Sequence, residues 1–274
     1  MKMEKKTRNA LLIGAAAAAL PLLAIAPGRA SRRQKAPFMG RNFAHRGLHS
    51  RDKSVPENSL EAFRIAAENG YGIELDVQLS KDGQVVVFHD DTLDRVCGVN
   101  ARVEEKTLDE LRELRLCGSD YTIPLFTEVL DVIRGRGPLI VELKSGKRNR
   151  ELCEKTYAIL EEYKGDVCIE SFNPFIVAWF RFHAKDMLRG QLAAPQEEYN
   201  MLPKIQRFLL SNTLLNFIAK PNFIAYKIGR RPLTVRLSEA MGAIKVGWTS
   251  HEPRNEKGRD AVIFEFYKPK LKYK

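Results

Sequence analysis

Cysteine is scarce in this sequence. There are four cysteines among 274 residues, and none of them forms a CxxC pair. That number is too small for a disulfide scaffold and argues against a zinc site built from cysteines. The composition, 44% hydrophobic and 29% charged, is that of an ordinary globular protein, which excludes a disordered, collagen-like or wholly membrane-embedded chain.

The folded part of the chain also has little net charge. The formal charge is +11, but residues 1–41 hold nine Lys/Arg and one Glu, which leaves only +3 for residues 42–274. A nucleic-acid-binding protein would carry its basic excess on the folded domain. We therefore expect no nucleic-acid partner.

A basic leader precedes the rest of the chain. Residues 10–27 are 18 uncharged, mostly apolar residues, just long enough to cross a bilayer. Lys/Arg residues flank them on both sides, as in a retained anchor, and Pro27 should hinder signal cleavage after Ala24-Ile-Ala26. We expect residues 1–37 to be a leader and linker that anchors the chain in a membrane, with secretion after cleavage as the alternative. The flanking charges are nearly balanced, so the side of the membrane stays open.

Residues 38–274 fit one large α/β domain. Short apolar runs predict strands at 42–45, 73–77, 139–143, 167–172, 188–192, 223–226, 243–248 and 261–266. Amphipathic patterns predict helices at 60–68, 127–134, 150–163, 175–183 and 202–219. Strands that alternate with helices pair in parallel through right-handed crossovers. Eight such strands predict a (β/α)8 TIM barrel, preceded by the hydrophobic helix of the leader.

One further apolar run, residues 84–89, does not fit the alternation. It follows the second strand, extended to residue 79, after only Ser80-Lys-Asp-Gly83. Parallel strands cannot be joined so briefly, so we expect an antiparallel hairpin excursion after the second strand. Asp82-Gly83 is typical of a two-residue turn, which would place Asp76 opposite His89.

Three acidic residues lie within otherwise apolar strands. Glu74 and Asp76 are two residues apart, so both carboxylates point to one face of their strand. Glu142 lies late in the strand at 139–143. Inward carboxylates repel one another unless a cation neutralises them, and oxygen ligands favour Mg²⁺ or Ca²⁺. The alternative is that these acids form structural salt bridges with Arg46 or Lys144.

Two histidines end apolar strands near these acids. His45 and His89 are suited to general acid and base work, because imidazole titrates near neutral pH. Arg46 and Lys144 add fixed positive charge, which suits a phosphoryl group. The other three histidines have no such context and are interpreted as surface or structural residues: His49, His183 and His251.

Together these residues resemble a known family, the glycerophosphodiester phosphodiesterases. The resemblance is dense over residues 42–145 and thin beyond, through Ser171-Phe-Asn173 and Trp248-Thr249. Its motifs are His45-Arg-Gly47, Pro56-Glu-Asn-Ser59, Glu74-Leu-Asp76, Lys81-Asp-Gly83, His89-Asp90, Ile123-Pro124-Leu125 with Glu128, and Glu142-Leu-Lys144. The resemblance implies a (β/α)8 barrel that hydrolyses glycerophosphodiesters to an alcohol and glycerol 3-phosphate.

The resemblance also implies roles for individual residues. The metal ligands would be Glu74, Asp76 and Glu142, the acid and base His45 and His89, and the phosphate or substrate contacts Arg46, Lys144 and Trp248. Glu57 and Asn173 receive only supporting roles. Asn58-x-x-Glu61 also fits a helix capping box, and Asn173 before Pro174 is a good helix start. A lysophospholipid phosphodiesterase at the membrane and a non-catalytic lipid- or phosphate-binding barrel remain as alternatives.

The chain departs from the family pattern in three places. Ser250-His251 replaces the usual Val-Asn, and the last crossover must be very short or irregular. Residues 175–250 also match the family poorly, and they hold eleven Lys/Arg and four Asp/Glu. Their apolar stretch at 208–218 would either pack on the sheet as a barrel helix or lie against anionic lipid.

Overall fold

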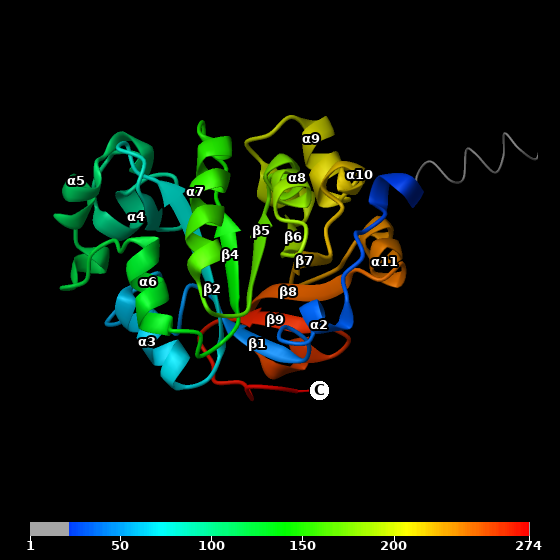
Figure 1. The fold of residues 1–274 in the computed structure, drawn as a ribbon, viewed down its shortest axis with the longest axis horizontal. Coiled ribbons are helices and arrows are strands. Elements are labelled where there is room, and N and C mark those ends of the chain that lie inside the picture. Colours follow the sequence, from blue (N-terminus) through cyan, green and yellow to red (C-terminus); the bar gives the residue numbers. More distant parts are fainter. Residues whose placement is uncertain (1–21, 274) are drawn as a thin grey trace, which may run out of the picture.

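The computed structural model describes residues 22–273 and contains a closed barrel of eight parallel strands (Figure 1). The barrel closes because β1 pairs with both β2 and β9. The predicted TIM barrel is therefore confirmed. Its strands are β1 (Arg41–Ala44), β2 (Gly72–Leu79), β4 (Leu139–Leu143), β5 (Val167–Ser171), β6 (Leu188–Ala193), β7 (Phe223–Lys227), β8 (Ile244–Ser250) and β9 (Ala261–Phe264).

Helices connect the strands and cover the outside of the barrel. Those between barrel strands, apart from the lobe described below, are α3 (Leu60–Glu68), α6 (Phe126–Ile133), α7 (Asn149–Glu162), α8 (Pro174–His183), α9 (Lys204–Ser211), α10 (Asn216–Ala219) and α11 (Leu233–Ala240). Between β8 and β9 there is only the 3-10 turn η4 (Pro253–Glu256). The expectation of a very short last crossover is confirmed.

Aromatic rings fill the inside of the barrel near its amino-terminal end. Phe43 and Phe223 belong to one buried apolar cluster with residues from most of the barrel strands. Their rings occupy the space where neighbouring strands carry glycine: a Cβ on Gly72 would overlap Phe43, and a Cβ on Gly190 would overlap Phe223. Glycine is thus required where these rings pack.

This packing gives a stability prediction. Gly190→Ala should destabilise the fold by about 1–3 kcal/mol, because the added methyl overpacks the core against Phe223. Thermal unfolding followed by circular dichroism measures the effect. Gly146→Ala is the control, since its Cβ would meet only the far end of Glu104. Equal melting temperatures for both variants would contradict this account of the barrel interior.

The hairpin excursion is present, but its predicted register is wrong. β3 (Val85–Val87) pairs antiparallel with β2 so that Val77 lies opposite Val87. Gly83 has φ +78°, which makes a three-residue turn whose last residue is left-handed, another common hairpin geometry. Asp76 therefore lies opposite Phe88, whose amide donates to its carbonyl (3.0 Å), and not opposite His89.

The excursion then forms a small lobe before α6. Its helices and turns bury their own apolar cluster, which includes Phe88, Val103 and Ile123. The elements are α4 (Asp94–Cys97), η1 (Val103–Glu105), α5 (Leu108–Arg112) and η2 (Leu116–Gly118).

The long helix predicted at 202–219 is wrong, because the structure divides it into α9 and α10. Thr213 between them has φ +51°, which no residue inside a helix adopts. The turn brings Leu214 N to Leu209 O (3.0 Å) and ends α9. No helix was predicted at α11, where the structure leaves Leu233 and Leu237 exposed.

The described amino-terminal residues pack against the barrel. Ile25 is 2% exposed, its carbonyl accepts from Asn216 Nδ2 (3.2 Å), and Gly28 N donates to Pro221 O (2.8 Å). Within 22–40 there is one short helix, α2 (Arg32–Lys35), after a turn of helix at 22–25. Most of the apolar segment predicted at 10–27 lies outside the described residues. Across residues 22–273, no helix has the length and apolarity needed to cross a bilayer.

Candidate active site

The candidate site is a cavity of about 810 Å³ at the carboxyl ends of the barrel strands. In TIM barrels this end carries the chemistry, because the loops that follow the strands converge there. His45 directly follows β1, Glu142 is the next-to-last residue of β4 and Trp248 lies late in β8. All three line the cavity.

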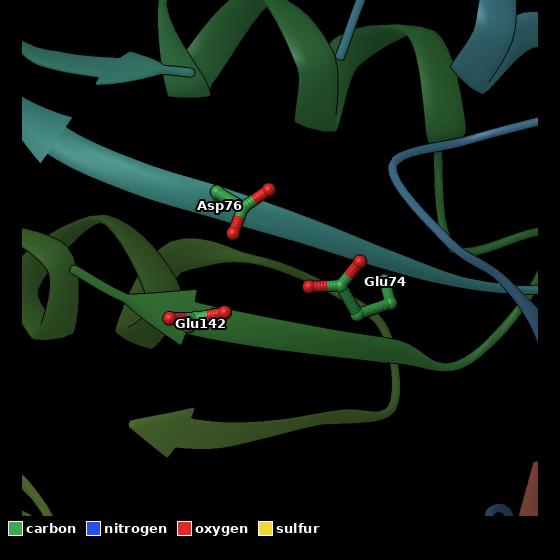
Figure 2. A group of neighbouring side chains, drawn as sticks. All are labelled: Glu74, Asp76 and Glu142. Atoms are coloured by element: carbon green, nitrogen blue, oxygen red, sulfur yellow. The ribbon is translucent and has the colours of Figure 1, made fainter. Parts of the chain in front are cut away.

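Three carboxylates gather between β2 and β4. Glu74 and Asp76 leave the same face of β2, and Glu142 on β4 is in register with Asp76. One oxygen from each carboxylate lies within 4.8 Å of the other two. Figure 2 shows the three groups facing a common space between the strands. The structure thus brings the three predicted acids together.

The cluster holds more acids than bases. Glu170 on β5, in register with Glu142, adds a fourth buried carboxyl group. Two basic side chains face them: Lys144 Nζ lies 2.8 Å from Glu142 Oε1, and Arg46 Nε lies 3.7 Å from Asp76 Oδ2. The salt bridges considered as an alternative are therefore present, but two bases cannot neutralise four acids.

Burial and repulsion shift the pKa values of these acids. Burial, and next the charge of Asp76, raise the pKa of Glu74 well above its usual range. Burial also raises the pKa of Glu142, although Lys144 opposes the rise. The pKa of Asp76 falls despite burial, because His89, Lys144 and Arg46 stabilise its charged form. Additional positive charge at this position would stabilise the ionised form of the buried carboxyl groups.

The donor set fits a divalent cation. All the candidate ligand atoms are carboxylate oxygens, which Mg²⁺ and Ca²⁺ prefer. Asp76 Oδ1 is buried and has no hydrogen-bond partner within the described part of the chain, although Lys144 Nζ lies 3.5 Å from it as an ion pair. A cation of charge +2 would balance the two carboxylates that Arg46 and Lys144 leave unmatched.

His45 is oriented by a carboxylate that the sequence did not reveal. Its Nδ1 lies 3.0 Å from Glu265 Oε2, and its Nε2 lies 3.9 Å from Glu74 Oε2, on the side of the acid cluster. Burial, and next the charge of Arg46, lower the pKa of His45 to about 4. With Nδ1–H donating to Glu265, a neutral His45 presents the lone pair of Nε2 to the site.

His89 is held in a similar way. It follows β3 in the turn that leaves the hairpin, and its Nδ1 lies 2.6 Å from Asp90 Oδ1. Arg95 holds Asp90 in turn, with Nε donating to Oδ2 (2.6 Å). His89 lines the same cavity as His45, so the structure brings both predicted histidines to one site.

The loop after β1 places Arg46. Arg46 has φ +52° and Gly47 has φ +79°, and a Cβ on Gly47 would overlap the backbone of Ala62. The tight turn this glycine allows lets Arg46 N donate to Glu74 Oε2 (3.0 Å). Its guanidinium donates to Glu57 Oε1 (2.7 Å).

Glu57 supports this arrangement from outside the cavity. It also accepts two hydrogen bonds from Arg95, at 2.6 and 2.8 Å. The capping box suggested for Asn58 is wrong: Ser59 caps α3, with its side chain accepting from Ala62 N. Asn58 instead has φ +55° and donates to Asp76 Oδ2 (2.9 Å).

One wall of the cavity is apolar. Trp248 Nε1 donates to Ala193 O (3.1 Å), which fixes its ring edge-on to Phe172 with centroids 5.8 Å apart. Asn173 caps α8 by accepting from Phe175 N (2.9 Å), so the helix-start interpretation is confirmed. The apolar wall includes Phe172, Phe175, Leu192, Leu202, Leu209, Leu210 and Trp248.

Sequence reasoning missed two acids at the site. Glu170 lies in an apolar strand, as Glu142 does, and that pattern could have revealed it. Glu265 had no such signal, because 220 residues separate it from His45. His251, interpreted as a surface or structural residue, also contacts Glu265, with Nε2 2.9 Å from Oε1.

Similar proteins identify the family. Residues 45–266 match the model of the glycerophosphoryl diester phosphodiesterase family. A glycerophosphodiester phosphodiesterase of Caldanaerobacter subterraneus subsp. tengcongensis is 40% identical over 188 residues, 64% of this chain and 76% of that protein. A protein of the same name from Bacillus altitudinis is 36% identical over 154 residues, 52% of this chain and 62% of its own.

Solved structures agree on the fold. An Oleispira antarctica phosphodiesterase in complex with the product sn-glycerol-3-phosphate matches with a TM-score of 0.67 and 24% identity, over 82% of this chain and 93% of that chain. The Thermotoga maritima glycerophosphodiester phosphodiesterase matches with a TM-score of 0.61 and 27% identity, over 81% and 93%. The chain belongs to the glycerophosphoryl diester phosphodiesterase family, whose members are metal-dependent enzymes that hydrolyse glycerophosphodiesters.

Proposed function

We propose that hydrolysis takes place in the cavity at the mouth of the barrel, with Glu74, Asp76 and Glu142 as ligands of one Mg²⁺ or Ca²⁺ ion. The observation that carries the proposal is the convergence of their three oxygens, within 4.8 Å of one another, in a cavity that two histidines also line. Bound there, the ion would neutralise a phosphate oxygen and polarise phosphorus.

The two histidines divide the proton transfers in this proposal. His45 takes the proton of the attacking oxygen, because burial keeps it neutral and its Nε2 faces the acid cluster. His89 gives a proton to the leaving alkoxide from another part of the cavity. Arg46 and Lys144 hold the phosphate by charge, and Trp248 packs against the substrate at the apolar wall.

A substrate panel tests the proposed function. Protein stripped with a chelator is given Mg²⁺ or Ca²⁺ and then glycerophosphodiesters with different alcohols, with lysophospholipids as the comparison. We expect release of glycerol 3-phosphate from the glycerophosphodiesters and no turnover without added ion. Faster turnover of the lysophospholipids would contradict the proposed substrate class, and metal-independent turnover would contradict the proposed site.

Glu265 gives a further prediction, for a positioning residue. Glu265→Gln should lower kcat by about 10²–10⁴-fold with little change in KM, because His45 loses the charge that fixes its tautomer. That charge raises the pKa of His45, so its loss should move the acidic limb of the pH–rate profile to lower pH. Steady-state kinetics across pH measure both effects.

The matched control changes another of the three histidines that contact Glu265, the third being His49, whose Nε2 lies 3.7 Å from Oε2. His251→Asn removes a contact to Oε1 and leaves the Oε2 contact to His45 intact. We expect its kcat and pH profile to follow the unmodified protein. An unchanged acidic limb in Glu265→Gln, with only lower thermal stability, would assign Glu265 a purely structural role.

We also propose that the apolar segment at 10–27 attaches the chain to a membrane. The uncharged, mostly apolar composition of this segment and its basic flanks support the proposal. Because Ile25 is buried against the barrel, the part that enters the bilayer would end before it. Alkaline extraction of membranes that contain the full chain tests this, and release of the intact chain into the soluble fraction would contradict it.

A further inference from the structure

Large exposed apolar side chains are confined mainly to one half of the barrel. From residue 40 to residue 174, all of which the structure describes, no large hydrophobic side chain is exposed. The second half and the first described residues carry most of them: Leu22, Leu23, Phe175, Phe182, Met201, Ile205, Phe208, Phe217, Leu233, Leu237 and Met241. Exposed apolar side chains that gather on one part of a protein indicate an interaction surface, whereas single ones scattered over the surface do not.

The two most exposed of these residues, Met201 and Ile205, lie in the turn before α9 and on α9 itself. Met201, Ile205 and Phe208 are 91%, 75% and 50% exposed. Met201 lies in the turn before α9, and Ile205 and Phe208, three residues apart on α9, lie on one side of that helix. We call these three residues the α9 face. The other side of α9 lines the cavity through Gln206 and Leu210. α9 therefore separates the cavity from the solvent-exposed surface that carries the α9 face.

Two basic residues, Lys204 and Arg207, lie on α9 itself, and two acids, Glu197 and Glu198, precede it on η3 (Gln196–Tyr199). Residues 175–250 hold eleven Lys/Arg and four Asp/Glu. Two of the basic residues are paired, Lys227 with Glu198 and Arg231 with Glu239. Within the described ranges, Lys204 and Arg207 on α9 itself form no ion pair, and Arg207 instead donates to Leu202 O (2.6 Å). A surface that is apolar and basic together complements an anionic lipid bilayer.

The leader leaves the barrel on the same side. Leu22 and Leu23 are exposed next to α10, where Lys220 Nζ contacts Ala26 O (3.4 Å). Figure 1 shows α9, α10 and the first described helical turn toward one end of the molecule and the carboxyl terminus toward the other. Burial of Ile25 leaves no long free tether, so a bilayer that holds residues 10–21 would lie close to the α9 face.

We propose that the α9 face docks on the surface of an anionic bilayer, so that the mouth of the barrel lies beside the lipid headgroups. The inference uses the membrane attachment proposed above and does not depend on the catalytic roles. Its test therefore measures contact without turnover.

The test places a fluorescent reporter at two positions of the full chain. Phe208→Trp reports on the α9 face, and Leu271→Trp, in the carboxyl-terminal tail, is the matched control at a residue of similar exposure (50% and 42%). Emission from the native Trp179 and Trp248 is subtracted with the unmodified protein. Vesicles contain phosphatidylcholine with brominated acyl chains, with or without phosphatidylglycerol.

We expect the added emission at 208 to fall about twofold or more in vesicles with phosphatidylglycerol, because an interfacial helix reaches the acyl boundary. Emission at 271 should stay unchanged. Equal quenching at both positions, or equal quenching with and without phosphatidylglycerol, would overturn the proposal. A shielded, blue-shifted emission at 208 before lipid is added would also overturn it, because the leader or a second copy would then cover the α9 face.

Discussion

Asp76→Asn and Glu74→Gln should each abolish measurable activity and weaken Mg²⁺ or Ca²⁺ binding, while the barrel stays folded. Each substitution removes a ligand charge and almost no volume. Glu74→Gln also relieves repulsion among buried carboxyl groups, so its thermal stability in the absence of ion should hold or rise. Asp76→Asn removes a charge that His89, Lys144 and Arg46 stabilise, so its melting temperature should fall. Calorimetric titration of the ion, thermal melts and turnover measure the three effects on the same preparations.

Glu162→Gln is the control for these variants. It makes the same chemical change on α7, at an exposed position far from the cavity. It should bind the ion and turn over substrate as the unmodified protein does. Near-normal turnover in Asp76→Asn or Glu74→Gln would show that the cluster of three acids is not the metal site.

His45→Ala and His89→Ala should each lower kcat by about 10²–10⁴-fold, the usual contribution of a positioned acid or base. The two variants should differ when the substrate carries an acidic leaving group, such as a nitrophenolate. That group needs no proton to depart, so His89→Ala should recover most of its activity with this substrate. His45→Ala should not recover, because the attacking oxygen still has to lose its proton.

His183→Ala is the control for this pair. His183 stacks on Trp179 (4.2 Å between centroids) outside the cavity, and its loss should leave kcat unchanged with both substrates. Recovery of His45→Ala instead of His89→Ala would reverse the proposed roles. Full activity with reduced melting temperature in either variant would assign that histidine a structural role.

The sequence predicted the part of the site that depends on single strands. The spacing of Glu74 and Asp76 determines that both side chains face the barrel interior, and the parallel order of strands brings Glu142 beside them. The first relation follows because every second side chain of a strand points to the same face, and the second follows from the order of the strands in the sheet. Bounds of the predicted strands and of four helices agree with the structure to within two residues.

The errors have local physical causes. Asp82-Gly83 fits a two-residue turn, but Gly83 also adopts the left-handed position of a three-residue turn, and that choice moves the register by one. Thr213 carries no sequence signal for its φ of +51°, so the helix break between α9 and α10 was missed. Asn58 was interpreted as a helix cap because Asn58-x-x-Glu61 matches the capping-box pattern. Its contact with Asp76 joins two separate elements, so no local pattern predicts that contact.

Closure of the barrel explains what could not be predicted. Glu265 reaches His45 only because β9 returns to pair with β1. No local residue spacing in the sequence predicts the contact between Glu265 and His45. The position of α9 beside the mouth of the barrel depends likewise on the turn at Thr213. From the apolar pattern alone, the helix would continue through this residue.

Activity measured as a function of bound ion tests the central claim most directly. Protein stripped with a chelator is titrated with Mg²⁺ or Ca²⁺, and bound ion and release of glycerol 3-phosphate are measured on the same samples. We predict that activity rises in proportion to occupancy and saturates at one ion per chain, and that Asp76→Asn shows neither binding nor release. Full release of glycerol 3-phosphate from protein without bound ion would contradict the account.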